Sequence, residues 1–170
     1  MFFCTAFPAA AAAVSMVMDL RTARVDNGWI LFSMIAGFTG RLMERGISGL
    51  WGAVAGCLLP MILLGWMFPF HMMGAGDIKL FCALGVSLGG TAVMKCIVAS
   101  MLIGACMSLF FMISQGCFRR RFYYFAEYAE ELLRTGQIRP YSRRDITTEE
   151  TFHFTVPVFM SVLLYAGGAY

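Results

Sequence analysis

An uncharged stretch near the middle of the chain reads GISGLWGAVAGCLLPMILLGWMFPFHMMGAG, residues 46–76, in which only His71 can carry a proton. A transmembrane helix needs about 20 apolar residues, so this stretch is too long for a single helix. We place one spanning helix at about residues 47–68. The proline and the glycines that follow it predict a break before the next helix.

Five further apolar runs flank this one, at residues 1–18, 28–40, 77–88, 92–117 and 154–170. The second of them extends to residue 43 if Arg41 reaches along its stem to the membrane interface. Only 14% of the 170 residues are charged, against about a quarter in soluble domains. The sequence therefore predicts an all-α, polytopic membrane protein of about six transmembrane helices, forming a single membrane-embedded domain over residues 1–170.

Lysine and arginine are distributed unequally between the loops, and cytoplasmic loops carry the excess. Ten lie on one side, namely Arg21, Arg24, Lys79 and seven arginines within residues 119–144, and three lie on the other, namely Arg41, Arg45 and Lys95. The richer side is expected to be cytoplasmic, which places Asp19 and Asp77 at cytoplasmic helix ends and at similar depth. Both chain ends then face outward.

A polar segment at residues 119–150 separates the fifth and sixth apolar runs. Its apolar residues recur at helical spacing, which predicts an amphipathic helix on the inner membrane surface. A solvated loop that only sets the topology fits equally well. The six cysteines lack the clustered spacing of a zinc site or a disulfide framework. We predict neither of these, and no cofactor.

Asp77 is one of few ionisable residues at membrane depth, where such groups are expected to be functional. It lies in MGAGDIKL, residues 73–80. Gly74 and Gly76 allow unusual backbone angles and the close approach of a second chain, which a peptide substrate requires. The alternative is a glycine-rich turn, with Asp77 capping a helix and Lys79 serving only as a topology charge.

Asp19 opens a second polar string, DLRTARVDN, residues 19–27. Taken alone, it is equally an end-of-helix charge. Two carboxylates about 4 Å apart repel by roughly 4 kcal/mol at an effective dielectric constant near 20, so such a pair shares one proton near neutral pH. The ionised member can activate water while the protonated member polarises a carbonyl. Asp26 is a rival for the place of Asp19, and the sequence does not divide the two roles.

The string GAGDIKL, residues 74–80, resembles the signature of the type IV prepilin peptidases and archaeal preflagellin peptidases, which are GxGD membrane aspartic proteases. Asp19-Leu20-Arg21-Thr22, with Arg24, Val25 and Asn27, resembles their first catalytic segment. The resemblance implies that Asp19 and Asp77 are catalytic and that Gly74, Gly76 and Lys79 line the substrate approach. This chain departs from the family in carrying Asp26 where proline is usual. It also lacks a cysteine-rich insertion, and so resembles the short, peptidase-only form.

The family resemblance also implies a substrate and a location. Prepilin-like proteins would lose a short basic leader at the cytoplasmic face of the inner membrane, with the hydrophobic pilin helix left in the lipid bilayer. No nucleic-acid partner is expected. Two other hypotheses remain open at this point: a small proton- or cation-coupled transporter using the paired aspartates, and a non-catalytic scaffold for pilus assembly. His71 and His153 are expected to be interfacial polar residues rather than catalysts.

Overall fold

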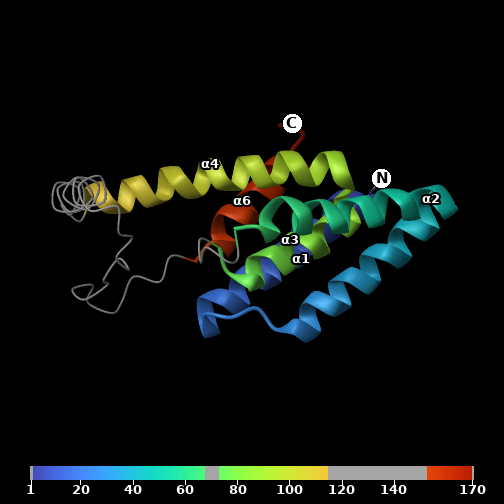
Figure 1. Ribbon diagram of the computed structural model, residues 1–170, viewed down its shortest axis with the longest axis horizontal. Coiled ribbons are helices and arrows are strands. Elements are labelled where there is room, and N and C mark those ends of the chain that lie inside the picture. Colours follow the sequence, from blue (N-terminus) through green and yellow to red (C-terminus); the bar gives the residue numbers. More distant parts are fainter. Residues whose placement is uncertain (1, 68–72, 115–152, 170) are drawn as a thin grey trace, which may run out of the picture. The chain divides into compact units, whose positions relative to one another are not determined.

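The computed structural model describes residues 2–67, 73–114 and 153–169. Across these ranges the chain forms α1 (Phe2–Thr22), α2 (Asn27–Gly65), α3 (Ala75–Leu88), α4 (Gly90–Ser114) and α6 (Thr155–Ala166) (Figure 1). The described residues contain no β-strand, which confirms the all-α expectation. The expectations for His71 and for the polar segment at residues 119–150 concern positions outside these ranges.

α2 contains the break expected between the second and third apolar runs. Gly46 has φ 61° and ψ −152°, a conformation that only glycine adopts readily. Figure 1 shows α2 turning back on itself within its length. Each part, residues 27–45 and residues 47–65, is about 28 Å long at 1.5 Å per residue, close to the thickness of the hydrocarbon core of a bilayer. The two helices expected here are therefore confirmed in position, separated by a single glycine.

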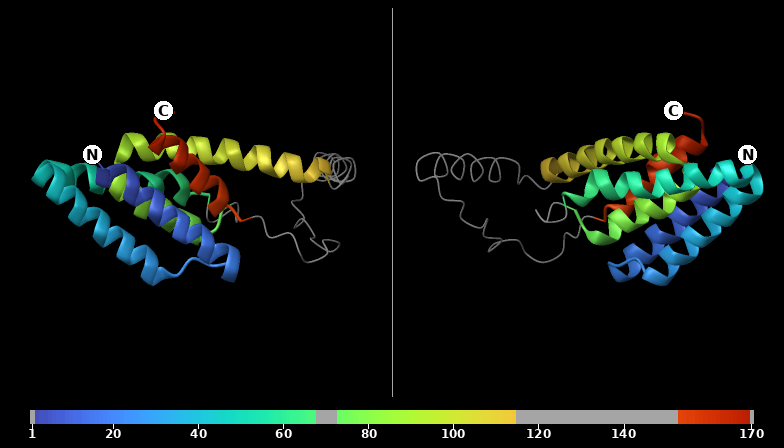
Figure 2. Two further views of the ribbon diagram at one scale, coloured as in Figure 1. Left: turned by 180° about the vertical axis from the view of Figure 1, so that it is seen from behind. Right: turned by 45° about the vertical axis from the view of Figure 1, so that its right-hand side comes forward.

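Contacts divide the chain into two compact units. One comprises residues 1–104 and 153–170, and the other comprises residues 105–152, of which the end of α4 is described. Within the first unit, α1 runs beside α6 (Figure 2), and α3 packs against both α2 and α1. Every residue from Leu80 to Leu88 is buried. α3 is therefore the central helix of this unit.

Glycines let α3 lie against both parts of α2. A Cβ atom on Gly56 or on Gly85 would overlap the carbonyl oxygen of the other residue, so the two backbones are in direct contact. On the first part of α2, a Cβ at Gly37 would lie only 2.5 Å from Oγ of Ser87. Small residues of this kind let membrane helices approach closely. This packing fixes the position of α3, whose first turn carries Asp77.

Arg41 corrects an expectation, because it does not reach outward to the membrane interface. Its side chain is 6% exposed, and its Nε donates a hydrogen bond of 3.1 Å to the backbone oxygen of Ser87. Ser87 lies in the last turn of α3, where carbonyl groups lack helical partners and the helix dipole is negative. Arg41 therefore caps the end of α3 opposite to Asp77. Gly89, with φ 85°, makes the turn expected before α4.

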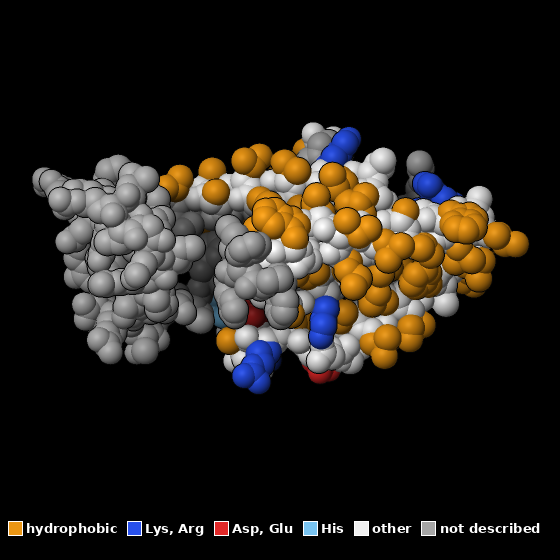
Figure 3. Space-filling view, in the orientation of Figure 1, with side chains coloured by type: hydrophobic (Ala, Val, Ile, Leu, Met, Phe, Trp, Pro, Cys, Tyr) orange, Lys and Arg blue, Asp and Glu red, His pale blue; other side chains and the backbone are white. Residues whose placement is uncertain are grey.

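Two of the described helices, α2 and α4, are long and apolar enough to cross a membrane. Only 28% of the most apolar stretch of α2 and 22% of that of α4 is buried. Figure 3 shows hydrophobic side chains over much of the face that α2 forms. Trp51 and Ile62 of α2, and Trp66 directly after it, are exposed. Apolar surface of this extent favours lipid over water as the surrounding solvent. The six-span topology stays a prediction.

Candidate active site

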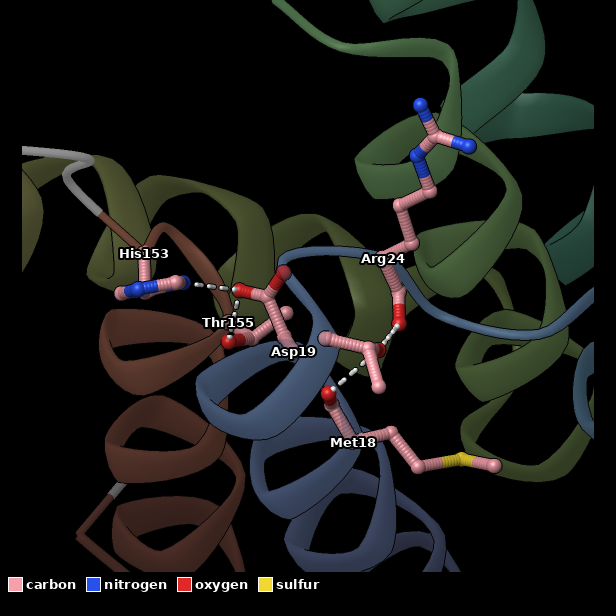
Figure 4. A network of polar contacts seen from close by, with 6 residues as sticks. Met18, Asp19, Arg24, His153 and Thr155 are labelled. Atoms are coloured by element: carbon pink, nitrogen blue, oxygen red, sulfur yellow. Dashed lines mark hydrogen bonds and ion pairs between the residues drawn. The ribbon is translucent and has the colours of Figure 1, made fainter.

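The end of α1 places Asp19 at the edge of the helix bundle. α1 continues one turn beyond residue 18, and Asp19 lies in its last turn. Ala23 then adopts a left-handed conformation, with φ 52°, and its N–H donates to the backbone oxygen of Asp19 at 2.8 Å. The hydroxyl of Thr22 lies 2.9 Å from the oxygen of Met18 and 2.8 Å from that of Arg24 (Figure 4). These bonds end the helix and turn the chain toward α2.

Two side chains at the start of α6 contact the Asp19 carboxylate, and both contact the same oxygen atom. The Thr155 hydroxyl donates to Oδ2 at 2.8 Å, and Nδ1 of His153 lies 3.1 Å from the same atom (Figure 4). The side chain of Asp19 is 14% exposed and that of His153 is 23% exposed. From the sequence, His153 was expected to be only an interfacial polar residue. The structure instead places its ring against the carboxylate of Asp19. The sequence signal was available, since His153 is an ionisable residue at the start of an apolar run.

Asp77 lies in the first turn of α3, outside both candidate spans, and is half-buried. Burial first, and then the negative charge of Asp19, raises the pKa of the Asp77 carboxyl to about 6, while a backbone hydrogen bond from Gly74 opposes the shift. Asp19 and Asp77 are 58 positions apart in the sequence, yet the side chains lie near enough for the charge of Asp19 to act on the Asp77 carboxyl. Their helices, α1 and α3, are packed together.

The two motif glycines provide space rather than unusual backbone angles. Gly74 is extended, with φ −71° and ψ 143°, and Gly76 lies within α3. Neither glycine therefore adopts the unusual backbone angles that the residue type permits. A Cβ on Gly74 would lie 3.2 Å from Oδ2 of Asp77, and one on Gly76 would meet nothing within 4 Å. Both glycines are exposed beside the carboxylate. Neither glycine places a side chain beside the Asp77 carboxylate.

Lys79 links the two sequence motifs. Its Nζ donates a 3.0 Å hydrogen bond to Oδ1 of Asn27, the first residue of α2. The connection between α1 and α2 is thereby attached to α3 beside Asp77. Asp26 precedes Asn27 at the N-cap position of α2, is exposed to solvent and makes no side-chain capping hydrogen bond. Among the described residues, no group of three His, Cys, Asp or Glu side chains is arranged to hold a metal ion.

An all-α bundle with apolar candidate spans and two interacting aspartates on adjacent helices is typical of membrane aspartic peptidases. A family model described as the type IV leader peptidase family matches residues 6–109, which include both aspartates. The chain belongs to this family, and membership implies leader peptidase activity and prepilin substrates at the level of the family. Comparisons with curated proteins and with solved structures gave no match.

Proposed function

We propose that this protein is a membrane aspartic endopeptidase that removes the short basic leader from prepilin-like proteins at the cytoplasmic membrane face. Asp19 and Asp77 are the two catalytic carboxylates in this proposal. The observation that carries it is that both motif aspartates lie within the matched region and that the charge of one acts on the other. Membership of the leader peptidase family supports the peptidase hypothesis, and no comparable observation supports the transporter hypothesis.

The proposed reaction needs the pair to hold one proton. The ionised carboxylate takes a proton from water as the water oxygen bonds to the scissile carbonyl carbon, and the protonated carboxyl gives its proton to the carbonyl oxygen. The leaving nitrogen then receives the proton taken from water, and the C–N bond breaks. A hydroxyl proton returns to the second carboxyl, so the singly protonated pair is restored. The raised pKa of Asp77, about 6, keeps this proton bound up to a higher pH than an ordinary carboxyl would.

The surroundings of Asp77 fit an extended peptide as substrate. Gly74 and Gly76 leave the carboxylate open to an approaching chain. Lys79 has its ammonium group bonded to Asn27, so we assign it the task of holding the loop before α2 against the site. The leader would arrive from the cytoplasmic side, where the distribution of lysine and arginine places both aspartates.

The test is cleavage of a prepilin-like substrate co-expressed with the full chain. Asp19→Asn and Asp77→Asn should each abolish leader removal, because neither variant can hold the shared proton in the required arrangement. Asp26→Asn is the matched control, since it changes an exposed carboxylate close by in the sequence and should leave cleavage unchanged. If both Asp19→Asn and Asp77→Asn cleave at the wild-type rate, the proposal is wrong.

A further inference from the structure

Two side chains, one in the first turn of α6 and one just before it, contact a proposed catalytic group from outside the region that the family model matches. His153 and Thr155 both lie beyond residue 109, where the match ends. They are 134 and 136 positions from Asp19 in sequence, yet both bond to its Oδ2 atom. Thr155 is 2% exposed, so its hydroxyl has been removed from water to make this bond. A buried hydroxyl is costly unless it is hydrogen-bonded, which argues that this contact is maintained.

The two carboxylate oxygens of Asp19 have different surroundings. The Thr155 hydroxyl donates to Oδ2 and Nδ1 of His153 lies 3.1 Å from the same atom, whereas no hydrogen bond to Oδ1 is found among the described residues. A hydroxyl and an imidazole N–H that donate to one oxygen stabilise negative charge on the group and fix its rotation. Asp77 has no such side-chain donors among the described residues, and a backbone group of Gly74 is its recorded partner. The two carboxylates are therefore in unlike environments.

We propose that His153 and Thr155 are positioning residues that hold Asp19 as the ionised, water-activating carboxylate, with Oδ1 facing the water, and leave Asp77 as the proton-bearing partner. The inference rests on the proposed function and adds to it a division of roles. The proposal requires the His153 tautomer that carries its proton on Nδ1, because an ionised carboxylate only accepts hydrogen bonds. Arg24 does not compete for the carboxylate, because its guanidinium points away from Asp19 (Figure 4).

Positioning of this kind affects the rate more than substrate binding. An error of about 1 Å in the place of a reacting group can cost on the order of 100-fold in rate. The proposal assigns substrate affinity to contacts along the leader and the hydrophobic helix, which substitutions at His153 and Thr155 are expected to leave unchanged. Loss of a donor to Oδ2 should therefore lower kcat by about 10- to 100-fold and leave KM within about threefold.

The experiment compares variants that remove each donor with variants that keep it. Thr155→Val has nearly the same shape but lacks the hydroxyl, whereas Thr155→Ser retains it. His153→Phe lacks the ring N–H, whereas His153→Asn offers an amide N–H near the position of Nδ1. Thr39→Val is the matched control, because the Thr39 hydroxyl donates only within its own helix, to Ile35 and Ala36.

Each variant is purified in detergent, its unfolding temperature is recorded, and its kcat and KM are measured. The probe is a fusion protein with a basic leader that ends in glycine, followed by a hydrophobic helix of about 20 residues. The proposal expects Thr155→Val and His153→Phe to lose kcat as stated above. Thr155→Ser, His153→Asn and Thr39→Val should stay within about fivefold of the wild-type protein.

Two outcomes overturn the inference. One is a wild-type kcat in both donor-removing variants. The other is an equal loss of kcat in the donor-keeping variants at an unchanged unfolding temperature, which would show a packing role. If Thr155→Val lowers the unfolding temperature, the comparison of His153→Phe with His153→Asn decides. If His153→Phe lowers it, the comparison of Thr155→Val with Thr155→Ser decides. Failure of the proposed function is separate, since it requires Asp19→Asn and Asp77→Asn to retain cleavage.

Discussion

Replacement of Gly85 by alanine tests whether the contact between α2 and α3 positions Asp77. The added methyl group would overlap the carbonyl oxygen of Gly56 and lie 2.7 Å from its carbonyl carbon. Carbon atoms in ordinary contact are about 3.5–4.0 Å apart, so the helices must separate by roughly 1 Å. Backbone atoms on both sides leave no flexible side chain to absorb this change.

The expected loss of activity exceeds the expected loss of stability. Overpacking costs about 1–3 kcal/mol, and the preference of alanine for helices returns about 1 kcal/mol. The net decrease in the free energy of unfolding is therefore about 2 kcal/mol or less. Asp77 lies eight residues before Gly85 on the same helix, so a shift of about 1 Å in α3 should be carried to the carboxylate and lower kcat on the order of 100-fold.

The assay measures leader cleavage and thermal unfolding of the same detergent-purified protein. Gly65→Ala is the control on α2, because a Cβ there meets nothing within 4 Å. It should leave kcat unchanged and leave stability equal or slightly higher. A Gly85→Ala protein that cleaves within threefold of the wild-type rate would refute the reasoning, since the close backbone contact would then not control the position of α3.

Three further predictions follow from the contacts described above. Since the pKa of Asp77 is raised to about 6, its proton is present below that pH and lost above it, so kcat/KM, which reports groups of the free enzyme, should fall as pH rises through about 6; a kcat/KM that stays flat to pH 8 contradicts this. Arg41→Met should lower the free energy of unfolding by about 1–3 kcal/mol, because the backbone oxygen of Ser87 loses a charged donor, whereas Arg45→Met, at an exposed position, should change it by less than about 0.5 kcal/mol. Ala23→Gly should raise the unfolding temperature, because φ of 52° costs an alanine about 1 kcal/mol that glycine does not lose; a decrease would count against the left-handed turn.

The sequence predicted the helices well because the signals for them are local. Uncharged runs long enough for helices are separated by glycine, proline or charge, and three of the breaks between described helical segments fall at or beside glycine. Gly46 interrupts α2, Gly74 precedes α3, and Gly89 separates α3 from α4. The sequence also singled out the two aspartates as candidates, because a carboxylate within an apolar chain is costly and therefore rare.

Contacts between helices could not be predicted in the same way. α3 is buried along nearly its whole length, so it has no single apolar stripe to show which side faces which neighbour. Arg41 illustrates the result: its sequence position is consistent with an interfacial side chain, but the crossing of α2 and α3 buries it against Ser87. A helix that is apolar all round can be rotated about its axis without any change in its hydropathy.

The sequence by itself predicted a chain of apolar helices. It also singled out Asp19 and Asp77 as carboxylates at the ends of apolar runs. Only the tertiary structure decided what surrounds them. It brought His153 and Thr155 to Oδ2 of Asp19 and attached Lys79 to Asn27. The physical reason is that a hydrogen bond depends on distances of about 3 Å between atoms. Such distances follow from the rotation and crossing of packed helices, which the order of polar and apolar residues along the chain does not fix.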